Sequence, residues 1–136
     1  MKYFELTPEL LNIRGQFYPV NQIIALFPGE DAARSAGRTL VEAGISEDGL
    51  SLITPEVMMR DVVRSVGSAD IPLPSPGTEA DTVRRFGQLA AQGHWALMIH
   101  APDNATAERV MKTLEEHQQP PSHAQRYRRL VIEDLA

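Results

Sequence analysis

The sequence predicts an α+β fold in which helices pack on a single sheet. Short runs rich in Val, Ile, Leu and Phe alternate with longer segments in which small and apolar residues recur every three or four positions. The first pattern is typical of strands and the second of amphipathic helices. Glycine and proline stand between these segments. The 136 residues, 43% of them hydrophobic, fit a single domain over 1–136.

The first predicted strand spans residues 20–27, between Pro19 and a Pro-Gly pair. A helix over residues 30–43 follows, because alanine and leucine recur there at helical spacing. Acidic residues in its first turn interact favourably with the helix dipole. Gly44 is the expected residue just past the end of this helix.

The second predicted strand spans residues 50–53, and residues 54–92 form a predicted helical insertion. Thr54, followed by a proline, is a typical start for the first helix of the insertion. Three prolines within residues 68–77 exclude regular helix or central strand there. Thr78 is the expected N-cap of the second helix of the insertion.

The third predicted strand spans residues 95–100. Its side chains alternate, so Trp95, Leu97 and Ile99 share one face of the sheet. A helix then runs from Asp103 or Asn104 to His117. Its apolar stripe consists of Ala107, Val110, Met111 and Leu114.

Residues 122–135 fit two interpretations. A helical stripe is formed by Ala124, Tyr127, Val131 and Leu135, and Ser122 with Gln125 matches a capping box. The β-rich run at residues 130–132 fits a strand instead. Both interpretations stay open from the sequence alone.

With a C-terminal strand, the order is β-α-β-β-α-β with the helical insertion between strands 2 and 3. This order predicts a ferredoxin-like two-layer sandwich, with the helices on one face of the sheet. Residues 1–19 are then an N-terminal extension, in which residues 2–6 resemble a short strand and Thr7 opens a short helix. In the alternative, residues 2–6 supply the fourth strand and the C-terminus is helical.

Residues 20–117 resemble small bacterial general-stress-protein-like domains. The similarity lies in the strand Ile24-Ala25-Leu26-Phe27-Pro28, the alanine-rich helix ending in Gly44-Ile45 and the strand at residues 50–53. The later segments 93–100 and 105–116 are similar to the matching strand and helix of that group. The resemblance implies a bacterial, stress-related protein with a ferredoxin-like core. It implies no catalytic residue.

The composition limits the classes of function that are compatible with this chain. The chain has no cysteine, which removes disulfides, thiolate metal sites and cysteine nucleophiles. The net charge of −5 argues against unspecific binding to nucleic acid or to an anionic membrane. The N-terminal residues do not match a signal peptide, and the longest apolar runs are too short to cross a bilayer. We therefore expect a cytoplasmic protein with no membrane or nucleic-acid partner.

A small anionic ligand is the first candidate for binding. The loop at residues 68–77 leads into a helix N-terminus, where free backbone N–H groups attract phosphate or carboxylate. Arginines lie on this helix and on the preceding one. The predicted anion site consists of Ser68, Ser75, Thr78, Arg60, Arg64 and Arg85.

His100 and Tyr127 are the second candidate pair, as an acid–base pair or as further ligand contacts if their strands are neighbours. The alternative is that Tyr127 packs in the core with its hydroxyl at the rim. The histidines predict no metal site: His94 and His100 are separated by roughly 20 Å along one strand, too far to share an ion. We predict no catalytic residue, metal or cofactor.

Three functions follow from these patterns. The first is a non-enzymatic accessory or regulatory domain that acts by homo-oligomerisation, by binding a small anion, or by both. The second is an RNA-binding module that uses the cluster Arg126-Tyr127-Arg128-Arg129. The third is an enzyme that uses His100 and Tyr127 in a cleft under residues 54–92.

Overall fold

The computed structural model describes residues 1–12, 15–67, 78–129 and 131–136. The chain forms an α+β structure around one mixed sheet of six strands in the order β1-β3-β4-β2-β5-β6. All neighbouring strands are antiparallel except β1 and β3. The strands are β1 (Lys2–Tyr3), β2 (Gln22–Phe27), β3 (Leu50–Ile53), β4 (Trp95–His100), β5 (His123–Tyr127) and β6 (Ile132–Asp134).

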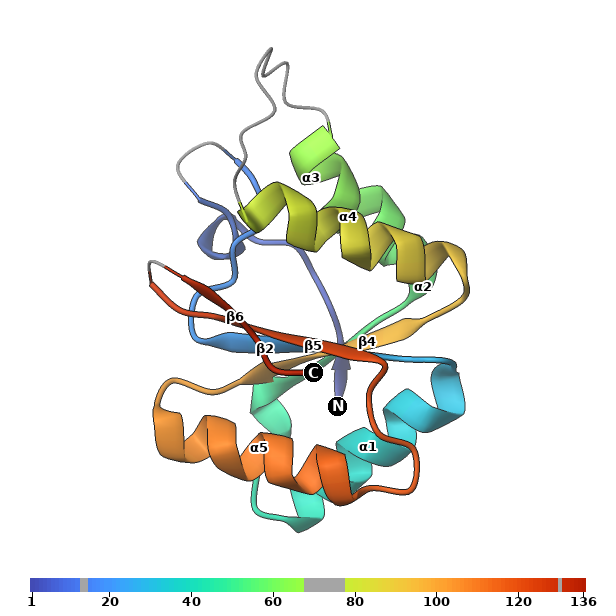
Figure 1. Ribbon diagram of the computed structural model, residues 1–136, viewed down its shortest axis with the longest axis vertical. Coiled ribbons are helices and arrows are strands. Elements are labelled where there is room, and N and C mark those ends of the chain that lie inside the picture. Colours follow the sequence, from blue (N-terminus) through green and yellow to red (C-terminus); the bar gives the residue numbers. More distant parts are fainter. Residues whose placement is uncertain (13–14, 68–77, 130) are drawn as a thin grey trace.

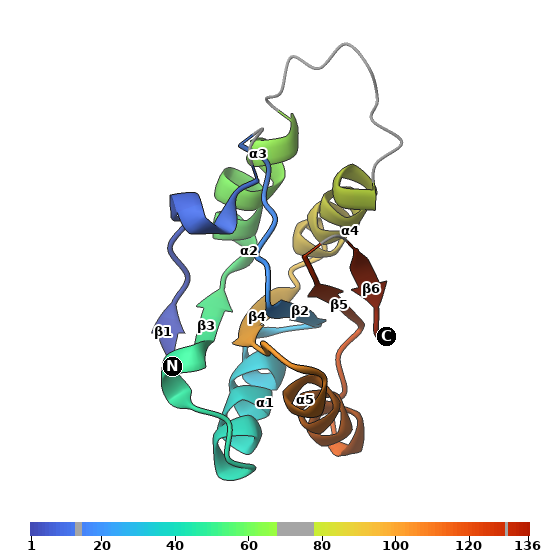
Figure 2. The same ribbon diagram turned by 90° about the vertical axis from the view of Figure 1, so that its left-hand side faces the viewer.

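Helices cover both faces of this sheet (Figures 1 and 2). On one face lie α1 (Glu30–Glu42) and α5 (Asn104–Glu116), whose small and apolar residues form one core with alternate residues of β2 and β4. On the other face lies the segment between β3 and β4. It contains α2 (Pro55–Val57), the π-helical turn η3 (Met58–Val63), α3 (Arg64–Gly67) and α4 (Thr78–Ala91).

The sequence predicted two layers, and the structure has three. The physical reason lies in the central strands, which have no polar face to expose. Five of the six residues of β2 are buried, because Ile23, Ala25 and Phe27 face α1 and α5 while Ile24 and Leu26 face the opposite core. Residues 54–67 and 78–92 cover this second apolar face, with Met58, Val62, Val83 and Phe86 packed against it.

The C-terminal segment is extended, not helical. β5 pairs with β2 along its whole length, and β6 turns back to pair with β5. Within the β-rich run at residues 130–132, Leu130 lies outside the described residues, Val131 precedes β6 and Ile132 begins it, whereas the main strand begins earlier, at His123. Central pairing to β2 favours this arrangement, because every residue of β5 is buried, including polar ones that do not belong to the helical stripe.

The N-terminal segment lies along one edge of the sheet. β1 pairs in parallel with β3, and the Phe4 N–H continues the pairing by donating to the Leu52 carbonyl at 2.9 Å. The short helix expected after Thr7 is the 3₁₀ turn η1 (Pro8–Leu10). Phe4 and Phe17 are buried and pack edge to face, with ring centroids 6.1 Å apart. These contacts hold the segment over the sheet face that also packs against η3 and α4.

Strand register places the two predicted site residues His100 and Tyr127 in one row with Gln22. Gln22 is the cross-strand partner of His100 on β4 and of Tyr127 on β5, so the three side chains share one face of the sheet.

Among the residues that the structure describes, no helix is long and apolar enough to cross a membrane.

Candidate ligand pocket beside His100

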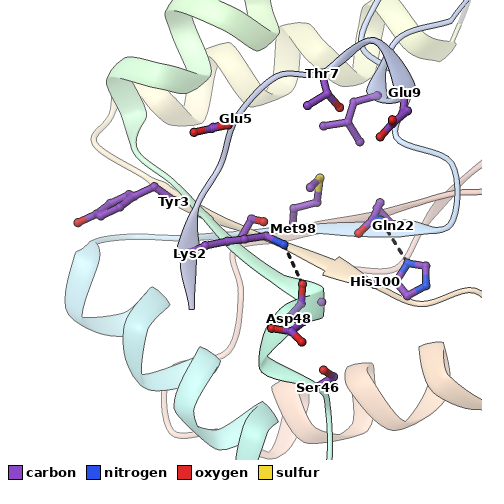
Figure 3. A pocket seen from close by; sticks show the side chains of 13 residues that line it. Lys2, Tyr3, Glu5, Thr7, Glu9, Gln22, Ser46, Asp48, Met98 and His100 are labelled. Atoms are coloured by element: carbon purple, nitrogen blue, oxygen red, sulfur yellow. Dashed lines mark hydrogen bonds between the residues drawn. The ribbon is translucent and has the colours of Figure 1, made fainter.

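A pocket of about 730 Å³ lies between the N-terminal segment and the sheet (Figure 3). Its floor is the sheet face at the ends of β2, β3 and β4. Its walls are the N-terminal segment and the 3₁₀ turn η2 (Glu47–Gly49). The polar lining residues are Lys2, Glu5, Thr7, Glu9, Gln22, Ser46, Asp48, Ser51 and His100.

His100 is the last residue of β4 and is exposed at the pocket. Its Nδ1 lies 3.3 Å from the Gln22 side-chain nitrogen. With the carboxamide nitrogen as the donor, Nδ1 is the acceptor of this bond. Gln22 thereby orients the imidazole at the pocket.

The floor beside His100 is made by two neighbouring strands. Ser51 on β3 and Met98 on β4 are direct cross-strand partners, so their side chains leave the same face of the sheet. Both are buried. They give the pocket one hydroxyl group and one flexible apolar surface, a combination typical of small-molecule sites.

The N-terminal wall is held by backbone and side-chain contacts. Lys2 is the register partner of Ser51, and its ammonium group donates to the Asp48 carbonyl at 2.9 Å. This bond joins β1 to the η2 turn across the pocket (Figure 3). The cationic group of Lys2 is therefore already engaged by the protein.

The pocket lining is acidic. Three carboxylates, from Glu5, Glu9 and Asp48, face one ammonium group, from Lys2, so the formal charge without His100 is 1 − 3 = −2. A lining of this sign repels phosphate and favours a cationic group. Hydroxyl and imidazole groups beside the carboxylates add hydrogen-bonding positions.

The predicted anion site is only partly within the described residues. Ser68 and Ser75 lie outside them, and Thr78 is the first residue of α4. Arg60 donates two hydrogen bonds to Asp61, at 3.0 and 3.1 Å, which lower the pKa of the Asp61 carboxyl. Arg64 and Arg85 are exposed. Arg60, Arg64 and Arg85 are not among the described residues that line the 730 Å³ pocket.

Arg85 instead faces the buried His123. Burial lowers the pKa of His123, and the positive charge of Arg85 adds to this effect, while the Asp134 carboxylate opposes it. The His123 ring also packs edge to face against Phe86, with centroids 6.2 Å apart. Arg85 therefore lies near β5, which is toward the edge of the sheet opposite to the edge formed by β1 and β3.

His100 and Tyr127 do not form a pair. Both flank Gln22, so strand β2 lies between them. The Tyr127 ring is fully buried and packs edge to face against Phe17 and Tyr18, at 5.8 and 5.0 Å. Its burial follows from the three-layer packing, and it removes Tyr127 from the pocket and from stacking on RNA bases.

The other histidines are hydrogen-bonded separately. His94 Nε2 lies 3.2 Å from the Ser122 hydroxyl, and His117 Nε2 lies 3.0 Å from the Ser35 hydroxyl. Within residues 1–12, 15–67, 78–129 and 131–136, no three His, Cys, Asp or Glu side chains lie close enough together to hold a metal ion.

Sequence reasoning found His100 but missed most of the pocket. The residues of the N-terminal wall come from a segment treated as an extension, whose parallel pairing with β3 joins positions far apart in the chain. One local signal was present: Lys2 and Tyr3 begin a short run with strand character.

Comparison with protein-family models, curated proteins and solved structures gave no significant match.

Proposed function

We propose that this chain is a non-enzymatic accessory domain that binds a small polar ligand in the pocket beside His100. The observation that carries the proposal is the pocket itself: about 730 Å³, formed by four separate parts of the chain and lined by an oriented imidazole, hydroxyl groups and carboxylates. This volume lies within the usual range for small-molecule sites.

The charge of the lining selects the ligand class. Glu5, Glu9 and Asp48 outnumber the ammonium group of Lys2, which already donates to a carbonyl oxygen. A small amine that also carries hydroxyl or further amino groups matches these acceptors. The anionic ligand expected from the sequence is therefore not proposed for this pocket.

Binding without catalysis is favoured by the surroundings of His100. Among the described residues, the imidazole of His100 hydrogen-bonds only to the Gln22 side chain, so no hydroxyl nucleophile is aligned with it. General acid–base chemistry needs such an alignment with the reacting group. An imidazole that a neighbouring amide orients is suited to hydrogen-bonding a bound ligand without taking part in a reaction.

The fold supports an accessory role of the kind expected from the sequence. The central strands are ordered β3-β4-β2-β5 and are antiparallel throughout, which fits a ferredoxin-like core with residues 54–92 as its helical insertion. The proposal keeps the single-domain organisation, the cytoplasmic location and the homo-oligomer expected from the sequence. An oligomer would use helices or the short edge strands β1 and β6, because both faces of the sheet are covered.

The test is a titration of ¹⁵N-labelled protein with putrescine, ethanolamine, glucose and inorganic phosphate. We expect the two amines to shift the amide signals of Ser51 and His100 saturably, and phosphate to leave these two signals unchanged. Glu9→Gln should weaken amine binding, whereas Glu56→Gln, an exposed carboxylate on α2 that does not line the pocket, should not. Amine shifts that are equal in both variants, or that do not involve the pocket, would reject the proposal.

A further inference from the structure

Two further cavities lie next to each other on the face of the sheet that α5 covers, at the N-terminal end of α5. Their volumes are about 380 and 310 Å³, and they share Asn104, Arg126 and Arg128. The larger one also includes Asn21, Asp103 and Arg129. None of these residues lines the pocket beside His100.

Arg126 is the central residue of this region. It lies on β5 with only 6% of its surface exposed, and its guanidinium donates from Nη1 to the side-chain oxygen of Asn104 at 2.9 Å. The closest carboxylate, from Glu133, lies 3.6 Å away and also binds Arg128 at 3.2 Å. Arg126 Nε is buried and has no hydrogen-bond partner among the described residues. Asn104 and Glu133 both engage Nη1, so the Nε–H of this buried guanidinium is left without an acceptor, which is costly unless a bound anion supplies one.

The larger cavity has a positive lining in an acidic protein. Its three arginines, Arg126, Arg128 and Arg129, oppose the carboxylate of Asp103 in the lining and that of Glu133, which pairs with two of them from the adjoining cavity, so the formal charge is 3 − 2 = +1, against −5 for the whole chain. The N-terminal end of the 13-residue helix α5 adds the positive end of its dipole. Arginine is the side chain best suited to bind oxyanions, because its planar fork matches their geometry.

Asp103 has a structural role that explains its presence in this positive lining. Its carboxylate accepts a hydrogen bond from the Thr106 N–H at 2.7 Å and so caps α5. That bond lowers the pKa of Asp103, and the carboxyl stays ionised at neutral pH. Together with Glu133, Asp103 therefore neutralises two of the three arginine charges and leaves a net positive charge.

We propose that the 380 Å³ cavity at the start of α5 binds a small oxyanion, of the phosphate monoester class, through Arg126, Arg128 and Arg129. The site is distinct from the pocket beside His100 in its residues, its face of the sheet and the sign of its charge. The two sites lie at the same end of the sheet, because Asn21 and Gln22 are consecutive and line one cavity each.

The test uses exposed residues, so that folding is preserved. Inorganic phosphate and glucose 6-phosphate are titrated at low ionic strength into ¹⁵N-labelled protein, and the amide signals of Asn21, Asn104 and Arg129 are followed. Arg129→Gln should weaken binding about tenfold, as expected for one charge-assisted contact. Arg84→Gln on α4, whose guanidinium pairs with Asp81, is the matched control and should leave the affinity unchanged.

Asp103→Asn gives an independent readout in the opposite direction. Asparagine caps helices about as well as aspartate, so α5 is preserved while a competing negative charge is removed. We expect phosphate to bind several-fold more tightly to this variant. Glu9→Gln, in the pocket beside His100, should not change phosphate binding, which separates this proposal from the preceding one.

Three outcomes would overturn the proposal. The first is the absence of a saturable shift at phosphate concentrations up to about 10 mM. The second is an equal loss of affinity in the Arg129 and Arg84 variants, which shows only diffuse attraction to exposed arginines. The third is salt-dependent binding of a single-stranded RNA, lost in Arg129→Gln, without binding of either small phosphate, which assigns the arginines to a nucleic-acid backbone.

Discussion

Gly49 and His100 approach each other so closely that a Cβ atom on Gly49 would lie 3.2 Å from the Cβ atom of His100. Gly49 ends the η2 turn, and its neighbours in the pocket wall are Ser46 and Asp48. The absence of a side chain at position 49 therefore lets the turn pack against the end of β4. This contact helps to set the position of the imidazole that Gln22 orients.

Gly49→Ala should displace His100 by a few tenths of an ångström, because the added methyl group is closer than an ordinary contact. We expect altered imidazole signals of His100 in a ¹H–¹⁵N spectrum and weaker amine binding, with the fold unchanged. Gly29→Ala is the matched control, because a Cβ atom at position 29 meets no atom within 4 Å. Unaltered His100 signals in Gly49→Ala would show that this contact does not position the ring.

Phe86 should be a major contributor to stability on the second face of the sheet. Its side chain is fully buried and fixes α4 against β5. Phe86→Ala should lower the free energy of unfolding by about 3–5 kcal/mol, through lost apolar burial and the cavity that remains. Urea denaturation measures this loss.

The control for Phe86 is Val41→Ala on the outer side of α1, where the side chain is 39% exposed. We expect that variant to change stability by less than about 0.5 kcal/mol. A similar effect of the two substitutions would contradict the packing of α4 on the sheet.

His123 should make the protein less stable at mildly acidic pH. Burial holds the pKa of His123 below its ordinary value of 6.5, so the unfolded chain binds a proton that the folded chain rejects. Stability is therefore full above 6.5 and is lost as the pH falls from there to the pKa in the folded state. Unfolding temperatures measured from pH 8 to pH 5.5 should fall with pH, and His123→Gln should flatten this dependence.

Val110→Ala provides the comparison for His123. This residue lies in the core on the other face of the sheet, so its truncation lowers stability without removing a titratable group. The variant should unfold at a lower temperature, but its unfolding temperature should depend on pH as steeply as that of the parent protein. If His123→Gln keeps that slope as well, the buried histidine is not its origin.

Thr54 should stabilise the start of the helical segment after β3. Its hydroxyl oxygen accepts a hydrogen bond from the Val57 N–H at 3.1 Å. Thr54→Ala should cost about 0.5–2 kcal/mol, whereas Thr54→Ser keeps the acceptor and should cost less. Equal losses in a denaturant titration of the two variants would show that the hydroxyl group is not the stabilising element.

Local patterns predicted the helices and central strands well. The strand at residues 95–100 has the predicted limits, and α5 begins after the expected cap, Asp103. Such elements are specified by side-chain periodicity and capping residues within short windows. Local patterns did not distinguish helix from strand in residues 122–135, because the periodicity there fits both. The strand β5 forms in this segment because it pairs with β2, which is distant in the sequence.

The pocket could not be predicted in this way. Its walls join Lys2 on β1, Asp48 in the η2 turn and His100 on β4, and only the assembled sheet brings them together. The same holds for the arginines at the start of α5, where the sequence showed a basic cluster but not that Arg126 is buried beneath Asn104. Non-local pairing determines both sites, and single-sequence patterns do not report it.

Native mass spectrometry of the freshly purified protein tests the central claim, that the pocket beside His100 holds a small ligand, most directly. The comparison variant is Thr7→Trp, which fills the pocket from the N-terminal wall at a residue whose hydroxyl caps no helix. The account predicts a bound small cationic molecule, or restored binding when putrescine is added, in the parent protein and in Glu56→Gln but not in Thr7→Trp. A protein that stays ligand-free at millimolar putrescine, or that binds it equally well with tryptophan at position 7, would contradict the account.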